Sequence, residues 1–404
     1  MPFRLNFVST CFATVFFAFA LAPAGSHAAT AAKASTSADA TAALRQKVDA
    51  TMQAVMSEYA VPGMAVALTV DGRTYFFNYG VASKEQKTAV TQETLFELGS
   101  VSKIFTATLA SYAEEQGFLS LDDHPSKYLP QLKGSAIDRA SLRQLGTYSA
   151  AGLPLQVPDN ITDSQQMITY FQNWKPSVTP GSVRLYSNAS IGLLGHLTGL
   201  AMQSNFTDAA QGILFPELGL KHSYITVPDQ AMADYAWGYD KNNRAVRVTP
   251  GMFDAEAYGV KASASDMLRM VQLNIEPEQL SGPLRYAVVA TQVAYEDVAV
   301  MVQGLGWEQY RYPVTLTQLL QGNAPAISGQ AQPVHAFQPQ QAPVGPRLFN
   351  KTGSTGGFGS YVLFVPEQKI GIVMLANKNF PIPARVTAAY TVLEQALRLK
   401  TALP

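Results

Sequence analysis

The spacing of apolar residues changes from a helical pattern to a strand pattern within the first hundred residues. Ahead of Pro62, apolar positions recur three and four residues apart. They predict an amphipathic helix that ends before this proline, carried by Leu44, Val48, Met52, Val55 and Met56. The Ala-, Thr- and Ser-rich residues 29–43 before it are expected to form a frayed terminus.

Two pairs of strands are predicted, one near each end of the chain. Residues 64–70 and 74–79 are apolar, β-branched or aromatic, and they flank Asp71-Gly72, a dipeptide typical of a hairpin turn that needs positive φ. Toward the other end, a second strand pair and then a helix are predicted at residues 361–365, 370–376 and about 384–399.

Between these ends, helical patterns separated by Pro- and Gly-rich loops replace the strand pairs, at residues 101–116, 164–174, 191–202 and 264–274. The pattern predicts a single domain over residues 29–404. In it, a discontinuous α/β lobe (about 40–98 and 300–404) encloses a mainly helical lobe (about 99–299). Ligand sites tend to lie in the cleft between two lobes. The Pro- and Gln-rich residues 324–346 are expected to form a long surface loop.

The first 28 residues have the pattern of a targeting segment. Arg4 precedes an almost uninterrupted apolar run over residues 7–24, and the small-residue sequence Ser26-His27-Ala28 follows. This order predicts a secretory signal peptide over residues 1–28, cleaved near Ala28. An N-terminal membrane anchor is the alternative, since the run is just short of the usual span of about 20 residues.

Composition narrows the classes of protein that remain. The chain has 404 residues, 47% hydrophobic and 14% charged, with 29 basic and 29 acidic side chains. Such a chain can bury a large core, and it lacks the surplus of positive charge that nucleic-acid binding needs. Loss of residues 1–28 would remove Arg4 and give a net charge of 28 − 29 = −1. It would also remove Cys11, the only cysteine, which excludes thiol nucleophiles and fits an oxidising compartment.

A serine–histidine–aspartate triad and a metal site lack support in the sequence. The G-x-S-x-G and H-E-x-x-H motifs are absent. The histidines that follow residue 28 have no convincing Ser or Asp signature beside them, and we expect ordinary surface or packed roles for His124, His196, His222 and His335.

Ser100-Val101-Ser102-Lys103 is the only S-x-x-K motif in the chain. On a helix, the three-residue spacing places the Ser100 hydroxyl and the Lys103 amine on one face. A buried lysine near other cations could accept the serine proton, because its pKa would be lowered. The motif alone is weak evidence, because about one S-x-x-K is expected by chance, and an ordinary surface pair is the alternative.

Two further motifs add chemistry to this pair. Tyr186-Ser187-Asn188 offers a phenol that ionises more easily near cations and an amide that can bind a substrate amide. Lys351-Thr352-Gly353 precedes a Gly-rich strand entry, residues 354–359, along whose edge a substrate backbone could lie. A bulged strand without function is the alternative for this run.

Together these motifs resemble the serine β-lactamases and penicillin-recognising enzymes, for which S-x-x-K and K-T-G are known signatures. Tyr186-Ser187-Asn188 in place of S-D-N makes the chain similar to class C, the AmpC-type cephalosporinases. Further blocks similar to the family cover the chain from about residue 45 to its end, in family order, at residues 96–103, 152–158, 185–188, 254–261, 303–308 and 375–381.

The resemblance implies a two-lobed β-lactamase/transpeptidase-like fold, α/β plus all-α, in which an antiparallel sheet is flanked by terminal helices beside a mainly helical lobe. It implies that Ser100 attacks the lactam carbonyl while Lys103 and Tyr186 share the proton transfer, with either one as the principal base. The N–H groups of Ser100 and Ser354 would form an oxyanion hole. Tyr186, with its cationic neighbours Lys103 and Lys351, would then support hydrolysis of the acyl-enzyme by water.

The resemblance also implies roles in substrate binding. Gln156 and Asn188 would hold the acylamide side chain, and Tyr258 would line the pocket that receives it, with a merely packed aromatic as the alternative. The catalytic Lys351 would face the substrate carboxylate together with Thr352, Gly353, Ser354 and Asn379.

Two positions depart from the family pattern. Asn350 stands before Lys351 where many members carry His, although some carry Asn. Ile382, between Pro381 and Pro383, occupies a place often filled by Asn. We expect one polar contact to the substrate carboxylate to be missing there, which would change the binding of some cephalosporins or inhibitors.

The sequence therefore predicts a secreted, periplasmic class C β-lactamase that hydrolyses small-molecule β-lactams through an acyl-enzyme on Ser100. No cofactor, metal, nucleic acid or membrane partner is expected once the leader is removed, and we expect a monomer. A D-alanyl-D-alanine peptidase or a lactamase-fold esterase is the nearest alternative, although Gln156 and the Lys351-Thr352-Gly353 motif favour the lactamase. A non-catalytic β-lactam receptor is the alternative outside enzymes, and it would normally carry an anchor or sensor module.

Overall fold

The computed structural model describes residues 25–341 and 345–402. Of the signal peptide predicted over residues 1–28, residues 1–24 lie outside the described range. The strands, in chain order, are β1 Gly63–Val70, β2 Arg73–Ser83, β3 Thr88–Ala89, β4 Phe96–Glu97, β5 Val183–Arg184, β6 Ser223–Tyr224, β7 Gly238–Tyr239, β8 Ala245–Val246, β9 Lys261–Ala262, β10 Ala294–Val298, β11 Met301–Gln303, β12 Glu308–Arg311, β13 Gln332–Pro333, β14 His335–Gln341, β15 Arg347–Ser354, β16 Gly359–Val365 and β17 Ile370–Ala376.

Ten of these strands form one antiparallel sheet in the order β14-β10-β11-β12-β15-β16-β17-β1-β2-β3. The two ends of the chain meet in its middle, where β1 pairs with β17 along their whole length. This arrangement confirms the antiparallel sheet expected from the two predicted strand pairs. The sheet also takes in β10, which begins a few residues before the expected lobe boundary at 300.

The predicted first hairpin is confirmed, including its turn. Val70 pairs with Arg73, so the loop is the two-residue Asp71-Gly72, and both loop residues have positive φ, +48° and +79°. These angles are those of a type I′ turn, whose twist matches that of the flanking strands.

The helices are α1 Gly25–Tyr59, α2 Lys103–Glu115, α3 Leu142–Gly146, α4 Ser164–Asn173, α5 Asn188–Ala201, α6 Phe206–Ala209, α7 Phe215–Glu217, α8 Asp254–Ala257, α9 Ala264–Ile275, α10 Gly282–Ala290, α11 Leu316–Gly322, α12 Pro325–Gly329 and α13 Ile382–Ala402. Each predicted helix is present, and all but the first lie within a few residues of their expected bounds; α1 begins well before Leu44. Among the described residues, no helix combines the length and the apolar character needed to cross a bilayer.

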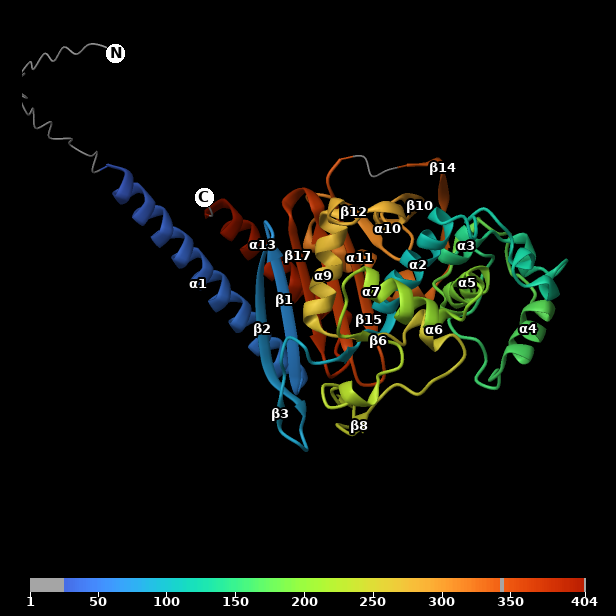
Figure 1. Cartoon of the computed structure of the whole chain (residues 1–404), viewed down its shortest axis with the longest axis horizontal. Helices are drawn as coiled ribbons and strands as arrows, with labels where there is room; N and C mark the ends of the chain where they lie inside the picture. Colours follow the sequence, from blue (N-terminus) through green and yellow to red (C-terminus); the bar gives the residue numbers. More distant parts are fainter. Residues whose placement is uncertain (1–24, 342–344, 403–404) are drawn as a thin grey trace, which may run out of the picture.

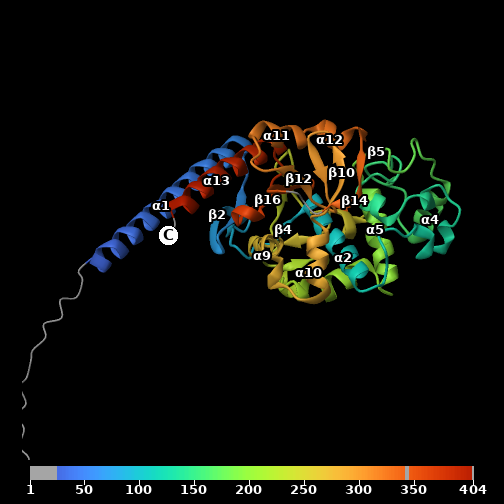
Figure 2. The same cartoon turned by 90° about the horizontal axis from the view of Figure 1, so that it is seen from above.

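The terminal helices α1 and α13 lie side by side and cover one face of the sheet (Figure 2). Leu44, Val48 and Met52 of α1 pack there with sheet residues such as Ile372 and Met374. The frayed terminus expected over residues 29–43 is wrong, because α1 begins at Gly25. The segment is rich in alanine, which has the highest helix propensity, so it continues the helix.

The opposite face of the sheet carries α9 and the mainly helical part of the chain, which extends to α4 at the end of the molecule away from α1 (Figure 1). Val373 and Leu375 point to this face, since side chains alternate along a strand, and they pack with Met267 and Val271 of α9. Helix α2 is buried over almost its whole length and packs against α5 and α10. The first residues of α2 are therefore enclosed by neighbouring elements of the structure.

Residues 324–346 differ from the long surface loop that the sequence predicts. Over most of this range the structure has the short helix α12 and the strands β13 and β14, and β14 pairs with β10 as the outermost strand of the sheet. Proline is tolerated in an edge strand, where one side needs no hydrogen-bond donor, so Pro-rich composition did not exclude a strand here.

Candidate active site

Ser100 and Lys103 lie at the point where a short 3₁₀ helix, Gly99–Ser102, continues directly into α2. The Lys103 Nζ donates to Ser100 Oγ over 3.0 Å, so the three-residue spacing does bring the two groups together as predicted. The side chain of Ser102, on another face, accepts from the Val260 backbone N–H and holds this turn in place. The partly exposed Ser100 thus presents its hydroxyl beside a lysine amine.

The Lys103 amine is enclosed by protein. The residue is 0% exposed, and its Nζ also donates to the carbonyl of Ala257, at the end of α8, over 2.7 Å. Burial lowers the pKa of Lys103 to about 8; the nearby Lys351 also lowers it, while Tyr186 acts against the shift. The unprotonated amine is consequently accessible near neutral pH.

Tyr186 lies directly before Ser187, the N-cap of α5. The Ser187 hydroxyl accepts from the Ser190 N–H and donates to the Pro154 carbonyl, which fixes the chain where the tyrosine leaves it. The ring of Tyr186 packs at 4.8 Å, centroid to centroid, from the ring of Tyr148. The hydrogen bonds of Ser187 therefore hold the Tyr186 backbone, and packing against Tyr148 holds its ring.

Two ammonium groups lie close to the Tyr186 ring, Lys103 Nζ at 5.1 Å and Lys351 Nζ at 5.0 Å from its centroid. Burial acts to raise the pKa of Tyr186, but the charges of Lys103 and Lys351 outweigh burial and lower the pKa to about 8. The hydroxyl is buried and has no hydrogen-bond partner within the described part of the chain. Its hydrogen-bonding capacity is therefore not used by the described residues.

Lys351 is held charged by Glu308 on the neighbouring strand β12. Its Nζ lies 3.7 Å from Glu308 Oε1, and the same oxygen lies 3.5 Å from Arg184 Nη2. Burial acts to lower the pKa of Lys351, but Glu308 and then Tyr186 hold it above the ordinary value. Arg184 is fully buried and also donates to Gln303 and Ile327. A buried carboxylate and a buried arginine thus lie beside the four catalytic candidates.

Strand β15 presents an open edge to Ser100. Strand β12 pairs with β15 only from Arg347 to Asn350, so residues 351–354 have β16 as their sole strand neighbour within the described ranges. The 3₁₀ helix that carries Ser100 packs against this segment. Gly353 permits the approach, because a Cβ there would lie 1.9 Å from the Leu98 carbonyl oxygen.

The backbone N–H groups of Ser100 and Ser354 are suitably placed to bind an oxyanion. Thr355 N–H donates to the Phe358 carbonyl at the β16 end. Since N–H groups alternate sides along a strand, the Ser354 N–H points away from β16, toward the open edge. The Ser100 N–H belongs to the first turn of a helix, where amides lack intrahelical acceptors.

Most of the predicted site residues line one cavity of about 140 Å³: Ser100, Tyr186, Lys351, Thr352, Gly353 and Ser354. Glu308 and Arg184 line it too, together with Ile382 at the start of α13. Lys103 is not among the lining residues, but its Nζ is hydrogen-bonded to Ser100 Oγ. The structure therefore brings the three motifs, which are separated by up to 250 residues in the chain, to one place.

Gln156 and Tyr258 line a second cavity, of about 620 Å³. Two hydrogen bonds to backbone carbonyls connect the chain next to Gln156 and Tyr258 with the residues around Ser100. Asn188 N–H donates to the carbonyl of Leu155, next to Gln156, over 2.8 Å, and Ala257, next to Tyr258, accepts from Lys103. Asn188 itself is buried, and its Oδ1 has no hydrogen-bond partner among the described residues.

Asn379, Asn350 and Ile382 have different surroundings. Both ends of the Asn379 amide are engaged, since Nδ2 donates to the Thr355 carbonyl and Oδ1 accepts from Arg385. The Asn350 side chain is buried and accepts from Asn323 and Tyr361. Ile382 does line the cavity of Ser100 and adds an apolar side chain to it.

Sequence motifs gave no indication of four features of this site: the Glu308 carboxylate, the Arg184 guanidinium, the Ala257 carbonyl and the small size of Gly99. Glu308 and Ala257 were within blocks similar to the family, and Arg184 precedes the Tyr186 motif by two residues. The charge of Glu308 inside an otherwise apolar block could have marked this residue as functional. Its partners Arg184 and Lys351 could be identified only from the three-dimensional structure.

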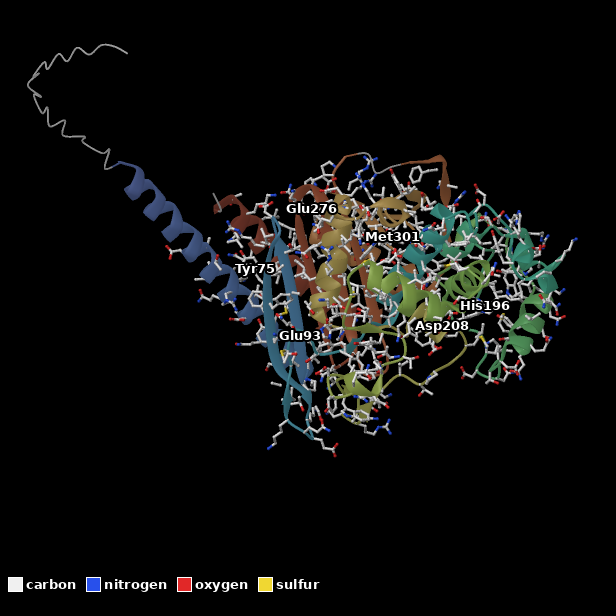
Figure 3. The ribbon with its side chains drawn as sticks, viewed as in Figure 1. Tyr75, Glu93, His196, Asp208, Glu276 and Met301 are labelled. Carbon is white, nitrogen blue, oxygen red and sulfur yellow. The ribbon has the colours of Figure 1, made fainter. Side chains whose placement is uncertain are left out.

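Histidines and metal ligands are not gathered at this site. His196 lies on α5 in the helical part of the molecule (Figure 3), where its ring packs 6.2 Å from that of Phe253. Within residues 25–341 and 345–402, no group of three or more His, Cys, Asp or Glu side chains is arranged to hold a metal ion.

Comparisons with known proteins agree with this geometry. The β-lactamase family model matches residues 48–397. A β-lactamase of Pseudomonas fluorescens is 48% identical over 350 residues, 87% of this chain and 98% of the relative. The crystal structure of a class C β-lactamase in complex with cefoxitin has a TM-score of 0.85 and 43% identity, covering 87% of this chain and 99% of that one. The structure of a D-alanine carboxypeptidase AmpC of Burkholderia cenocepacia has a TM-score of 0.84 and 47% identity, covering 88% and 99%.

Proposed function

The chain belongs to the β-lactamase family as a class C serine hydrolase, and from this premise we propose that Ser100 is its nucleophile. The hydroxyl would form an ester with the lactam carbonyl carbon, and water would then hydrolyse that ester. One observation carries the proposal: Ser100 Oγ lies 3.0 Å from a buried amine, Lys103 Nζ, whose pKa burial lowers to about 8. A hydroxyl next to such a base is the usual form of an activated serine.

Acylation transfers one proton from Ser100 to the Lys103 and Tyr186 pair. Oγ bonds to the carbonyl carbon, the oxygen becomes negative, and collapse of this intermediate breaks the ring C–N bond. The leaving nitrogen takes the proton back from the pair. Since both groups have a pKa of about 8 and share a site, they titrate together, and the pair acts as the base.

The negative oxygen of the intermediate would accept from the N–H groups of Ser100 and Ser354. The open edge of β15 and the first turn of the Ser100 helix support this role, because each leaves an amide without a strand or intrahelical acceptor in the described ranges. Removal of one such donor costs about 100- to 1,000-fold in kcat in serine hydrolases.

Deacylation needs a base for the incoming water. Tyr186 fits this step, because its buried hydroxyl has no hydrogen-bond partner among the described residues and the charges of Lys103 and Lys351 favour the phenolate. The water proton would pass to Tyr186, the hydroxide would attack the ester carbon, and the Ser100 oxygen would regain a proton as it leaves.

The two cavities support a division of substrate binding. Lys351, Thr352 and Gly353 in the smaller one would face the carboxylate of the lactam, beside the apolar Ile382. Gln156 and Tyr258 in the larger one would receive the acylamide side chain, with Asn188 between the two. Asn379 would bind the substrate carboxylate through Nδ2, once the bond from Nδ2 to the Thr355 carbonyl opens. A cephalosporinase preference is part of this proposal.

Export to the periplasm also belongs to the proposal. It is supported by the charged start, apolar run and small-residue site within residues 1–28. We further propose that the exported enzyme is monomeric.

D-alanine carboxypeptidase activity is the second candidate. It is favoured by the D-alanine carboxypeptidase of Burkholderia cenocepacia, which is similar over 99% of its length. The peptide reaction uses the same nucleophile and oxyanion donors, so the site itself permits both. The two activities differ in which acyl-enzyme water can release.

Steady-state kinetics on the purified protein separates the candidates. We expect fast multiple turnover of a chromogenic cephalosporin, and slow or absent release of D-alanine from a D-alanyl-D-alanine peptide. Ser100→Ala should abolish both, whereas Ser111→Ala, on the helix α2 that follows, removes a hydroxyl without a hydrogen-bond partner among the described residues and should retain most activity. A single burst equal to the enzyme concentration, with steady peptide cleavage, would favour the carboxypeptidase instead.

A further inference from the structure

A guanidinium group is buried directly behind the end of strand β15. Arg385, on the first turn of α13, is 0% exposed. Its Nη1 donates to the Gly353 carbonyl over 2.6 Å and to Ser354 Oγ over 3.0 Å. Its Nη2 donates to Asn379 Oδ1 and to the Phe380 carbonyl. No carboxylate in the described ranges forms an ion pair with it.

The chain makes room for this charge at a specific place. Gly359 faces Ser354 across the strand pair, and a Cβ on Gly359 would lie 2.7 Å from the Arg385 Cζ. A buried cation without a counter-ion is costly, so its hydrogen bonds must come from carbonyl and hydroxyl oxygens. Burial lowers the pKa of Arg385 to about 10, which leaves the group protonated at neutral pH.

The Gly353 carbonyl and the Ser354 N–H belong to the same peptide group. A charge-assisted bond to the carbonyl oxygen draws electrons away from the amide nitrogen and makes its N–H a stronger donor. We propose that Arg385 is a positioning residue that strengthens the oxyanion donor Ser354 by polarising the Gly353–Ser354 peptide from behind. The proposal rests on the proposed function of Ser100 and adds a residue to it. Arg385 acts through the amide and has no exposed surface with which to touch substrate.

The expected effect of Arg385 on kcat/KM is smaller than that of an oxyanion donor, because Arg385 acts through the Ser354 amide. An oxyanion donor is worth about 100- to 1,000-fold in kcat, and polarisation strengthens a hydrogen bond by about 10–30%. Loss of the charge should therefore lower kcat/KM by about two- to eightfold. The Ser354 Oγ contact is separable, because Ser354→Ala removes it and leaves the peptide group intact.

Infrared spectra of the acyl-enzyme report the strength of the donor directly, because a stronger hydrogen bond lowers the stretching frequency of the ester carbonyl. The probe is cefoxitin, which is present in the structure of a class C relative. The proteins are the wild type, Arg385→Met, Arg385→Lys and Ser354→Ala. Arg347→Met is the matched control, since Arg347 is a 7% exposed arginine at the opposite end of the same strand.

Arg385→Met should move the ester carbonyl to higher frequency and lower kcat/KM by about two- to eightfold. Arg385→Lys should fall between this variant and the wild type, and it carries the test if Arg385→Met does not fold. Ser354→Ala and Arg347→Met should keep the wild-type frequency, even where the melting temperature falls.

A wild-type carbonyl frequency in an acylated Arg385 variant would overturn the role of Arg385 and leave Ser100 as the nucleophile. The same would follow from an equal shift in Arg347→Met. Failure of the wild type to form an ester on Ser100 would overturn the proposed function itself, and the role of Arg385 with it.

Discussion

Gly99 and Ser354 lie so close together that a Cβ on Gly99 would be 2.4 Å from Ser354 N. Gly99 also has φ +54°, in the left-handed region that glycine adopts without strain. The residue before the nucleophile therefore lets the end of β15 approach Ser100 from the side. The distance between the two proposed oxyanion donors depends on this absent side chain.

Gly99→Ala should push β15 away from Ser100 and lower kcat/KM by about 100-fold, the cost of one misplaced oxyanion donor. Gly117→Ala is the matched control, because Gly117 also has positive φ, +76°, but open space where its Cβ would lie. Both variants should lose about 1–3 kcal/mol of stability from the strained backbone. Equal activity in the two variants would show that the close approach is not needed.

Glu308→Gln should shift the pH profile. Glu308 raises the pKa values of Lys103 and Lys351, so its neutralisation lowers both. The acid limb of kcat/KM, set by Lys103 and Tyr186, should therefore move to lower pH, by about half a unit to one unit. The control is Glu276, the residue that follows α9 and pairs with Lys369 (Figure 3). Glu276→Gln should leave the acid limb of the pH profile unchanged. An unmoved acid limb in Glu308→Gln would contradict the assigned electrostatics.

The same Glu308→Gln variant should also be less stable. Arg184 and Lys351 are both buried and would lose their shared carboxylate. Breaking a buried ion pair from one side typically costs about 3–5 kcal/mol. Chemical denaturation measures this loss, and a change below about 1 kcal/mol would mean that water already screens the pair.

The larger cavity should favour acyl side chains that carry a positive charge. Asp159 is the one charged residue among those that line it, and it is exposed. We compare kcat/KM for cephalosporins that share a nucleus and differ in an ammonium, neutral or carboxylate group on the acyl chain. Asp159→Asn should reduce the preference for ammonium over carboxylate by about two- to fivefold, since an exposed charge is screened. The neutral substrate is the internal control, and an unchanged ratio would place that side chain elsewhere.

A metal chelator should leave the rate intact, because in the proposed mechanism Lys103 and Tyr186 would carry out the proton transfers that a metal-bound water would otherwise perform. Turnover of a chromogenic cephalosporin with and without the chelator measures this. Loss of activity, restored by added zinc, would contradict the serine mechanism.

Local sequence signals were sufficient where one segment determines the outcome. The Asp71-Gly72 turn, the alternating strands around it and the helical spacing of Ser100 and Lys103 depend on neighbours a few residues away. Each follows from the local sequence alone. The separate motifs could be joined into one site only through the resemblance, because no spacing rule links Ser100 to Lys351.

Tertiary partnership explains what the sequence did not predict. Glu308 takes its role from Arg184, 124 residues away, and from Lys351 on the next strand. Arg385 takes its role from the carbonyl of Gly353, 32 residues away. Strand β14 forms only because β10 offers an edge. Such pairings leave no pattern within either segment alone.

The central claim is that Ser100 carries the acyl group. Time-resolved mass spectrometry of the purified protein mixed with a cephalosporin tests it directly. The account predicts a transient adduct on the peptide that contains Ser100, which decays as product accumulates, and no adduct or turnover in Ser100→Ala. An adduct on another residue, or continued turnover by Ser100→Ala, would contradict it.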